Sequence, residues 1–237
     1  MTLLLTNDDG IDAPGLEVLE TLVTDLPHLT AAPRLPHSGC GHRVTAHQAI
    51  QVEDAPTPDH PQRYAVHGTP ADCTRLALAK LCPEPPHWVI SGINAGGNLG
   101  VDVYLSGTVA AVREAAYQGI PGIAISQYLK GGQEPDWNCT GIWAAKVIAQ
   151  LLKQPPKPGG FWNVNLPWPE GKRSATQIPD LVFCQPSRDP LPLRYEPQGD
   201  RGDRYLYSGR YGDRVAAPGT DVAVCFGGAI AITHLCT

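Results

Sequence analysis

The chain has 237 residues, 42% of them hydrophobic, which is enough for one large α/β domain or a domain with a sizeable appendage. Its 18 basic and 23 acidic residues give a formal charge of −5, which provides no general attraction for nucleic acid polymers or anionic membranes. The seven cysteines are scattered without a C-x-x-C pair, which argues against a disulfide framework and a zinc site. Because the sequence shows neither a signal-like start nor a membrane-length apolar tract, we expect a cytoplasmic protein.

The first two thirds of the chain alternate between strand and helix patterns. Short apolar runs bounded by turn residues predict buried strands, and apolar positions three and four residues apart predict helices. A capping residue, a proline and an acid at Thr69-Pro70-Ala71-Asp72 mark the start of one helix. In chain order we expect strand 3–6, helix 14–25, strand 29–32, strands 44–52 and 64–67, helix 70–81, strand 87–91, helix 108–118, strand 122–126, helix 141–153 and strand 161–166.

The composition changes after residue 166. Proline, arginine and aspartate become frequent, long helical patterns are lacking, and strands are expected only near 205–207 and 229–233. We therefore predict a Rossmann-like, three-layer α/β core with a mainly parallel sheet over residues 1–166. Residues 167–237 form a strand- and hairpin-rich region for packing or oligomer contacts, within a single structural domain.

The first expected strand ends on two adjacent carboxylates, Asp8 and Asp9, followed by Gly10. Ligands of open α/β sheets bind outside the carboxyl ends of the parallel strands. Two like charges side by side are costly unless a cation, hydrogen-bond donors or solvent offset them. A bound divalent metal ion is the simplest explanation of this pair.

A second polar segment, from Ser91 to Thr108, also leaves the carboxyl end of a strand. It contains the amides of Asn94 and Asn98 and several glycines, and ends on Ser106-Gly107-Thr108, which opens a helix. The free N–H groups at the start of a helix favour an anion, and serine and threonine hydroxyls add donors. We interpret residues 106–108 as a phosphate cradle; the alternative is that Ser106 or Thr108 is only a helix cap.

A third loop, from Ala32 to His42, follows the second strand and carries Ser38-Gly39. Asp8, Asp9, Ser38 and Asn94 together would form an all-oxygen shell. Such a shell suits Mg²⁺ or Mn²⁺ completed by water and substrate phosphate, and argues against zinc or copper. The metal ion would orient the phosphoryl oxygens and polarise a water molecule.

Other catalytic motifs do not fit the sequence. Ser38, Ser91 and Ser106 do not lie in a G-x-S-x-G element, the glycines near residue 96 do not match the dinucleotide fingerprint, and there is no P-loop. A phosphoaspartate enzyme stays an alternative, although Asp-Asp-Gly lacks the spaced D-x-D arrangement. Asp72 is interpreted as a helix-capping acid, and no role is assigned to the loop histidines.

Three segments, 5–15, 68–73 and 91–108, together resemble the SurE family, the survival-protein-E 5′-nucleotidases. The resemblance implies a Rossmann-like core and a divalent-metal phosphomonoesterase that hydrolyses nucleoside 5′-monophosphates, in some members also 3′-monophosphates or short polyphosphate. It matches Asp8, Asp9, Ser38 and Asn94 to the family's metal ligands, with one Mg²⁺ or Mn²⁺ per subunit. It matches Asn98, Ser106, Gly107 and Thr108 to the phosphate side. The chain departs from the family at Arg34, where an acid is common.

The family also implies a homodimer or homotetramer assembled through C-terminal elements. The resulting mechanistic hypothesis is that a metal-held phosphate is attacked by water, while Asp8 or Asp9 handles a proton. Two alternatives stay open: a phosphatase for a non-nucleotide substrate such as a sugar phosphate or polyphosphate, and a non-catalytic nucleotide-binding protein. A panel of phosphomonoesters assayed with Mg²⁺ and Mn²⁺ separates them.

Overall fold

A computed structural model of the chain describes residues 1–169, 177–199 and 201–237. Its strands are β1 (Leu3–Thr6), β2 (His28–Pro33), β3 (Val52–Asp54), β4 (Arg63–Val66), β5 (Trp88–Ala95), β6 (Gly122–Gln127), β7 (Gly160–Leu166), β8 (Leu181–Cys184), β9 (Tyr195–Gln198), β10 (Arg204–Tyr207) and β11 (Ile230–Cys236). Within the described residues, nine strands form the central sheet in the order β3-β4-β2-β1-β5-β6-β7-β11-β8.

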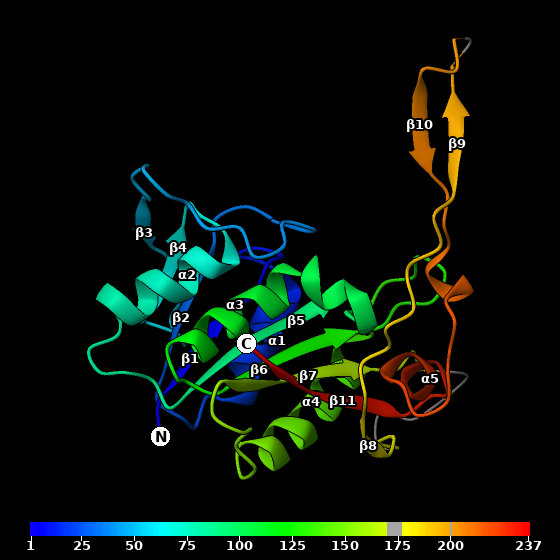
Figure 1. Cartoon of the computed structure of the whole chain (residues 1–237). Coiled ribbons are helices and arrows are strands. Elements are labelled where there is room, and N and C mark those ends of the chain that lie inside the picture. The colour runs from blue at the N-terminus through cyan, green and yellow to red at the C-terminus, as the bar shows by residue number, and fades with distance from the viewer. Residues whose placement is uncertain (170–176, 200) are drawn as a thin grey trace.

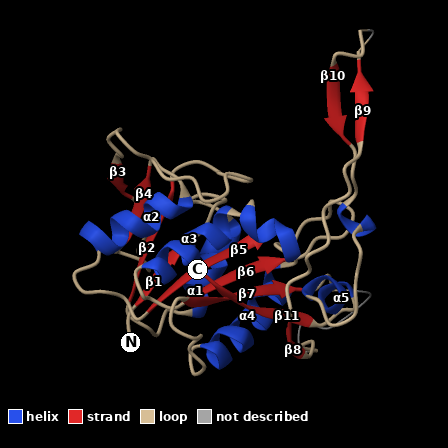
Figure 2. Ribbon diagram, viewed as in Figure 1, coloured by secondary structure: helices blue, strands red, loops and turns tan. Residues whose placement is uncertain are grey.

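Helices cover both faces of this sheet, as Figure 2 shows. The α-helices are α1 (Pro14–Leu22), α2 (Pro70–Leu76), α3 (Gly107–Tyr117), α4 (Trp137–Leu151) and α5 (Asp221–Phe226), and a π-helix (Ala77–Leu81) continues α2. Helices α1 and α4 bury their apolar sides in one core cluster, and α2 and α3 bury theirs in another on the opposite face. The predicted Rossmann-like, three-layer fold is confirmed.

Strand β1 lies at the centre of the core and is buried on both sides. Leu3 and Leu5 belong to the cluster under α1 and α4, whereas Leu4 belongs to the cluster under α2 and α3. A strand covered by helices on both faces needs apolar side chains at every position, which explains the uninterrupted apolar run in the sequence.

The chain changes direction across the sheet at β1. This strand pairs in parallel with β2 on one side and with β5 on the other. After β2 the chain adds β4 and β3 at that edge and then returns to place β5 beside β1. The carboxyl ends of β1 and β5 therefore border the topological switch point, where open α/β sheets bind ligands.

One predicted strand is wrong. Residues 44–51 form turns and irregular structure, and β3 begins only at Val52. The start of the segment is instead hydrogen-bonded to the beginning of α2: the Thr69 hydroxyl donates to the Arg43 carbonyl, and the N–H of Thr45 donates to the Asp72 carboxylate. These side-chain contacts replace the backbone pairing that a strand requires.

The region after residue 166 contributes strands to the central sheet. Strand β11 runs antiparallel to β7 and parallel to β8. Strands β9 and β10 pair with each other and extend from the body as a separate hairpin arm (Figure 1). The division into 1–166 and 167–237 stays a prediction, and its second part includes residues 170–176 and 200, which lie outside the described residues. No helix in the described part of the chain has the length and apolarity to cross a membrane.

The start of α2 is fixed by a capping box. The Asp72 carboxylate accepts hydrogen bonds from the N–H of Thr69 at 2.9 Å and from the hydroxyl of Thr45 at 2.7 Å, and the Thr69 hydroxyl accepts one from the N–H of Asp72. Burial acts to raise the pKa of Asp72, but these hydrogen bonds outweigh it and hold the pKa below its ordinary value. The helix-capping interpretation of Asp72 is confirmed.

We expect Asp72→Asn to lower the free energy of unfolding by about 1 kcal/mol at pH 7, because the amide cannot reproduce every bond of the carboxylate. A depressed folded pKa stabilises the protein above the unfolded pKa, and this contribution is lost as the pH falls through the folded pKa. Wild type and variant should therefore converge below pH 3.8, the ordinary value for aspartate. Urea unfolding at pH 7 and pH 3 checks this, with the exposed Asp54→Asn as the control. A difference as large at pH 3 as at pH 7 would contradict it.

Candidate active site

The two carboxylates predicted from the sequence lie directly after β1, at the switch point. Asn7 shapes the turn that presents them: its Nδ2 donates to the Gly10 carbonyl at 2.8 Å, and its Oδ1 accepts from the N–H of Gly10 at 3.2 Å. Asp8 is only 4% exposed, whereas Asp9 is half-buried. The first carboxylate of the pair is thus held inside the protein, and the second lies at its surface.

Asp8 faces the N-terminus of α3. The Thr108 hydroxyl donates to Asp8 Oδ1 at 2.5 Å. Burial raises the pKa of Asp8 to about 6, hydrogen bonding to Thr108 acts against this rise, and the Asp9 charge adds to it. The positive end of the helix dipole and the Thr108 hydroxyl therefore stabilise an anion that burial disfavours.

The close approach of α3 to Asp8 depends on Gly107. A Cβ atom at this position would lie 2.7 Å from the Cβ of Asp8 and 3.0 Å from the Cγ of Pro70. The preceding Ser106 caps the helix, because its Oγ accepts from the N–H of Val109 at 3.1 Å. The expected helix start at 106–108 is present, and its hydroxyls contact Asp8 and the helix backbone.

The loop that carries Ser38 packs onto Asp8 through the backbone. The N–H of His37 donates to the Asp8 carbonyl at 2.7 Å. Further along the loop, the N–H of Gly41 donates to the Leu105 carbonyl at 2.9 Å, and His42 Nε2 lies 2.9 Å from Glu114 Oε2 on α3. These contacts anchor the loop on both sides of the exposed Ser38. The residue before it, His37, is the one that contacts Asp8.

Asn94 reaches the site through an irregularity in β5. The pairing of β5 with β6 shifts register between Ser91 and Asn94, a bulge of the kind that re-aims side chains. Gly92 makes this possible, since its φ is +144° and a Cβ there would lie 2.5 Å from the Ile125 carbonyl oxygen. The N–H of Ala95 lies 3.5 Å from Asp9 Oδ2, so the Asn94 segment adjoins the second carboxylate. The Asn94 Nδ2 donates to the Gly96 carbonyl, and the predicted role of Asn94 as a metal ligand stays a prediction.

Asn98 lies deeper, at the ends of β6 and β7. Its Nδ2 donates to Ser126 Oγ at 2.8 Å, and its N–H donates to Asn165 Oδ1 at 2.7 Å. Its carbonyl accepts from the amides of Asn163 and Asn165. Asn98 is therefore held by the two strands, and its predicted role toward phosphate stays a prediction.

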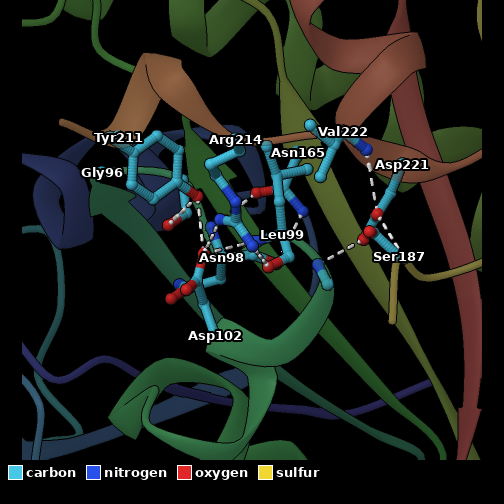
Figure 3. Close-up of polar contacts among 12 residues, drawn as sticks. Gly96, Asn98, Leu99, Asp102, Asn165, Ser187, Tyr211, Arg214, Asp221 and Val222 are labelled. Carbon is cyan, nitrogen blue, oxygen red and sulfur yellow. Dashed lines mark hydrogen bonds and ion pairs between the residues drawn. The ribbon is translucent and has the colours of Figure 1, made fainter. Parts of the chain in front are cut away.

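Residues from the C-terminal region form a polar cluster that supports the glycine-rich loop after β5 (Figure 3). Sequence reasoning missed this cluster. Arg214 pairs with Asp102 and donates to the Leu99 carbonyl at 2.8 Å. The Tyr211 hydroxyl donates to Asp102 at 2.7 Å and lies 3.0 Å from the Gly97 carbonyl. The Arg214 and Asp102 side chains are almost completely buried, so the pair fastens the loop from inside the protein.

Asp221, at the first position of α5, holds the same loop from the other side. Its carboxylate accepts from the N–H of Gly100 at 2.7 Å and from the N–H of Ser187 at 2.8 Å. Asp102 and Arg214 are 112 positions apart in the sequence, and Gly100 and Asp221 are 121 positions apart. Ser187, the other partner of Asp221, belongs to an irregular segment. No spacing rule links such residues, and thus the sequence offered no signal for them.

The four predicted metal ligands come from the turn after β1, the loop after β2 and the end of β5, which converge on one edge of the sheet. Their donor atoms are two carboxylates, a hydroxyl and an amide oxygen, which are the ligands of a hard cation. Among the described residues, no group of three or more His, Cys, Asp or Glu side chains could hold a metal ion. A site with only two carboxylates fits Mg²⁺ or Mn²⁺, which keep several water ligands. Burial also raises the pKa of Asp9, so both carboxylates gain from a bound cation.

The fold and this site define a Rossmann-like α/β protein with a carboxylate pair aimed at a helix N-terminus. A family model described as "Survival protein SurE" matches residues 3–190. The chain therefore belongs to the SurE family, as its motifs indicated.

Related proteins support this membership over nearly the full length. A Nostoc sp. protein named "Putative 5'-nucleotidase alr3139" is 52% identical over 235 residues, which cover 99% of each chain. The "5'-nucleotidase SurE" of Heliobacterium modesticaldum is 38% identical and covers 99% of this chain and 86% of its own. The crystal structure of the SurE protein from Aquifex aeolicus superposes with a TM-score of 0.83 at 27% identity, covering 100% of this chain and 93% of that one.

We expect Gly107→Ala to destabilise the protein by about 1–3 kcal/mol, because the added methyl group must displace Asp8 or Pro70. The matched control is Gly212→Ala, where a Cβ meets no atom within 4 Å. Chemical unfolding of both variants checks the expectation. Equal stabilities for the two variants would contradict the tight contact between α3 and Asp8.

Proposed function

We propose that this chain is a divalent-metal-dependent 5′-nucleotidase, which hydrolyses nucleoside 5′-monophosphates to nucleosides and phosphate. The observation that carries the proposal is the Asp8–Asp9 pair, held at the switch point against the N-terminus of α3. The names of the Nostoc and Heliobacterium relatives support the choice of nucleotides as substrates.

Asp8, Asp9, Ser38 and Asn94 would hold one Mg²⁺ or Mn²⁺ ion. When bound, such an ion neutralises phosphoryl charge and polarises water. Thr108 fixes the orientation of Asp8 by donating to its Oδ1. Asp9 lines an open cavity, whereas Asp8 is buried. Because Asp9 is the more exposed carboxylate of the pair, we assign the proton-accepting role to Asp9.

The phosphate side of the site consists of Asn98 and residues 106–108. The backbone N–H of Thr108 interacts with Asp8, and the helix dipole favours the negative charge of a phosphate there. Asn98 is fixed by the ends of β6 and β7, so it needs no rearrangement when the substrate binds. Such preorganised donors stabilise the charge that develops during phosphoryl transfer.

We expect Asp9→Asn to lower metal-dependent phosphate release from AMP by roughly 10²–10⁴-fold, the range typical for loss of a general base. The variant should unfold at nearly the wild-type temperature without metal, and lose the stabilisation by Mn²⁺ that wild type shows. The exposed Asp25→Asn serves as the control. Phosphate release by Asp9→Asn at the wild-type rate would contradict the site assignment. A wild type that releases phosphate only from non-nucleotide esters, or from no ester, would contradict the nucleotidase assignment.

We also propose that the chain forms a homodimer or homotetramer through the β9–β10 arm. The arm and its base expose large apolar side chains to solvent, among them Leu193 at 82%, Tyr205 at 66% and Leu206 at 58% exposure. An exposed apolar cluster on a projecting hairpin is typical of a surface that is covered in an assembly. The arm also presents unpaired strand edges that a second copy can cover.

We expect the double substitution Tyr205→Asp and Leu206→Asp to convert the oligomer into a monomer, because two buried charges in the interface would cost more than the apolar contacts contribute. Sedimentation velocity measures the change. Ile142→Asp, on the exposed side of α4, should leave the oligomeric state of the wild type unchanged. An unaltered oligomer after the double substitution would show that another surface forms the interface.

A further inference from the structure

We propose that the cavity beside Asp9 is the nucleoside subsite of this enzyme, and that it takes a purine base between Trp137 and Arg34. The inference rests on the proposed nucleotidase function and deepens it. The cavity has a volume of about 420 Å³, and its lining includes Asp9, Asp12, Arg34, Ala95, Glu134 and Trp137. This volume lies in the range of small-molecule sites.

The position of the cavity connects it to the reacting phosphate. Its lining includes Asp9 and Ala95, which adjoin each other at the carboxylate pair. A phosphate held at the pair therefore has this cavity as a direct continuation for the rest of the substrate. The cavity extends from there along the turn after β1 and the first residues of α1 to the start of α4.

Trp137 contributes a partly buried aromatic side chain to the lining of the cavity. It is the first residue of α4, and the preceding Asp136 caps the helix by accepting from the N–H of Cys139. The edge of the indole is braced against α1, since a Cβ on Gly15 would lie 2.9 Å from the Cη2 atom of the ring. A base that stacks on a side chain already held in place loses little ordering entropy, and every base offers a π-face for stacking.

Arg34 supplies the polar recognition. It lines the cavity, and its Nη1 donates to Asp12 Oδ2 at 2.9 Å. A guanidinium has five N–H donors, and this ion pair uses one of them. Purines present the N7 acceptor to such a donor, whereas pyrimidines have no N7 atom. The carboxylates of Asp12 and Glu134 add acceptors for the amino groups of a base or for ribose hydroxyls.

A second cavity, of about 580 Å³, is the competing location for the base. Its lining includes the aromatic residues Tyr128, Trp168, Tyr211 and Phe226. None of the four proposed metal ligands lies in that lining, whereas Asp9 lies in the lining of the first cavity. Direct continuity with the carboxylate pair therefore favours the cavity beside Asp9. Trp168, in the second cavity, provides a matched control for substitutions of Trp137.

The test measures kcat and KM of full-length wild type and variants for AMP, GMP, UMP and ribose 5-phosphate, which has the same phosphoester and no base. Trp137→Ala should lower kcat/KM for the nucleotides by about 5- to 150-fold, the range for loss of one base-stacking contact, mainly through KM. Trp137→Phe should restore most of the loss. Arg34→Ala should lower kcat/KM for AMP and GMP more than for UMP, because uracil offers an O4 acceptor but no N7. Ribose 5-phosphate should be unaffected by all three variants, and Trp168→Ala should behave as wild type.

Three outcomes would overturn the inference while leaving the proposed function intact: equal losses of Trp137→Ala on AMP and ribose 5-phosphate, no loss on either, or a nucleotide-specific loss for Trp168→Ala instead. A wild type that releases phosphate from ribose 5-phosphate but from none of the nucleotides would contradict the proposed function and the nucleoside subsite together. Thermal unfolding of each variant verifies that it is folded.

Discussion

The structure of the site depends on one electrostatic constraint, which is that the Asp8 carboxylate is buried beside the charge of Asp9. Burial raises the pKa of Asp8, and the neighbouring charge adds to this rise. The compensation comes from α3, whose N-terminus and Thr108 hydroxyl face the carboxylate. Gly107 is needed because a side chain there would keep the helix away. The loop of Ser38 and the bulge of β5 then close around the same pair of charges.

The site is also supported from a distant part of the chain. The glycine-rich loop after β5 carries Asn98, and it is fastened by the buried pair of Asp102 and Arg214 and by the carboxylate of Asp221. Arg214 and Ser187, which belong to this support, lie on the two sides of the projecting β9–β10 arm along the chain. The attraction within a buried ion pair is largely offset by the cost of desolvating both charges, so we interpret this pair as a fastening of the loop and not as a source of stability. The residues on the two sides of the arm therefore also anchor the loop that carries Asn98. The proposed assembly surface is thus linked along the chain to the phosphate side of the site.

Much of the core followed from local sequence patterns. The β1 strand, the capping box of α2 and the Ser106 cap of α3 depend on residues a few positions apart, which periodicity and cap rules read directly. The predicted strand is wrong over residues 44–51 because bonds to the start of α2 replace strand pairing: the Thr45 N–H donates to Asp72, and the Thr69 hydroxyl donates to the Arg43 carbonyl. The Arg214–Asp102 pair spans 112 positions, and only the folded chain brings it together. Thr108 was assigned to phosphate, and the structure shows in addition its bond to Asp8.

The central claim is that Asp8, Asp9, Ser38 and Asn94 form the binding site of a single divalent metal ion. Anomalous X-ray diffraction from crystals soaked in Mn²⁺ tests it most directly, because the signal locates the ion without reference to activity. We expect one anomalous peak per chain at the carboxyl end of β1, in direct contact with the oxygen atoms of these four side chains. A peak at another site, a histidine or cysteine among the ligands, or no peak at the Asp8–Asp9 pair would contradict it.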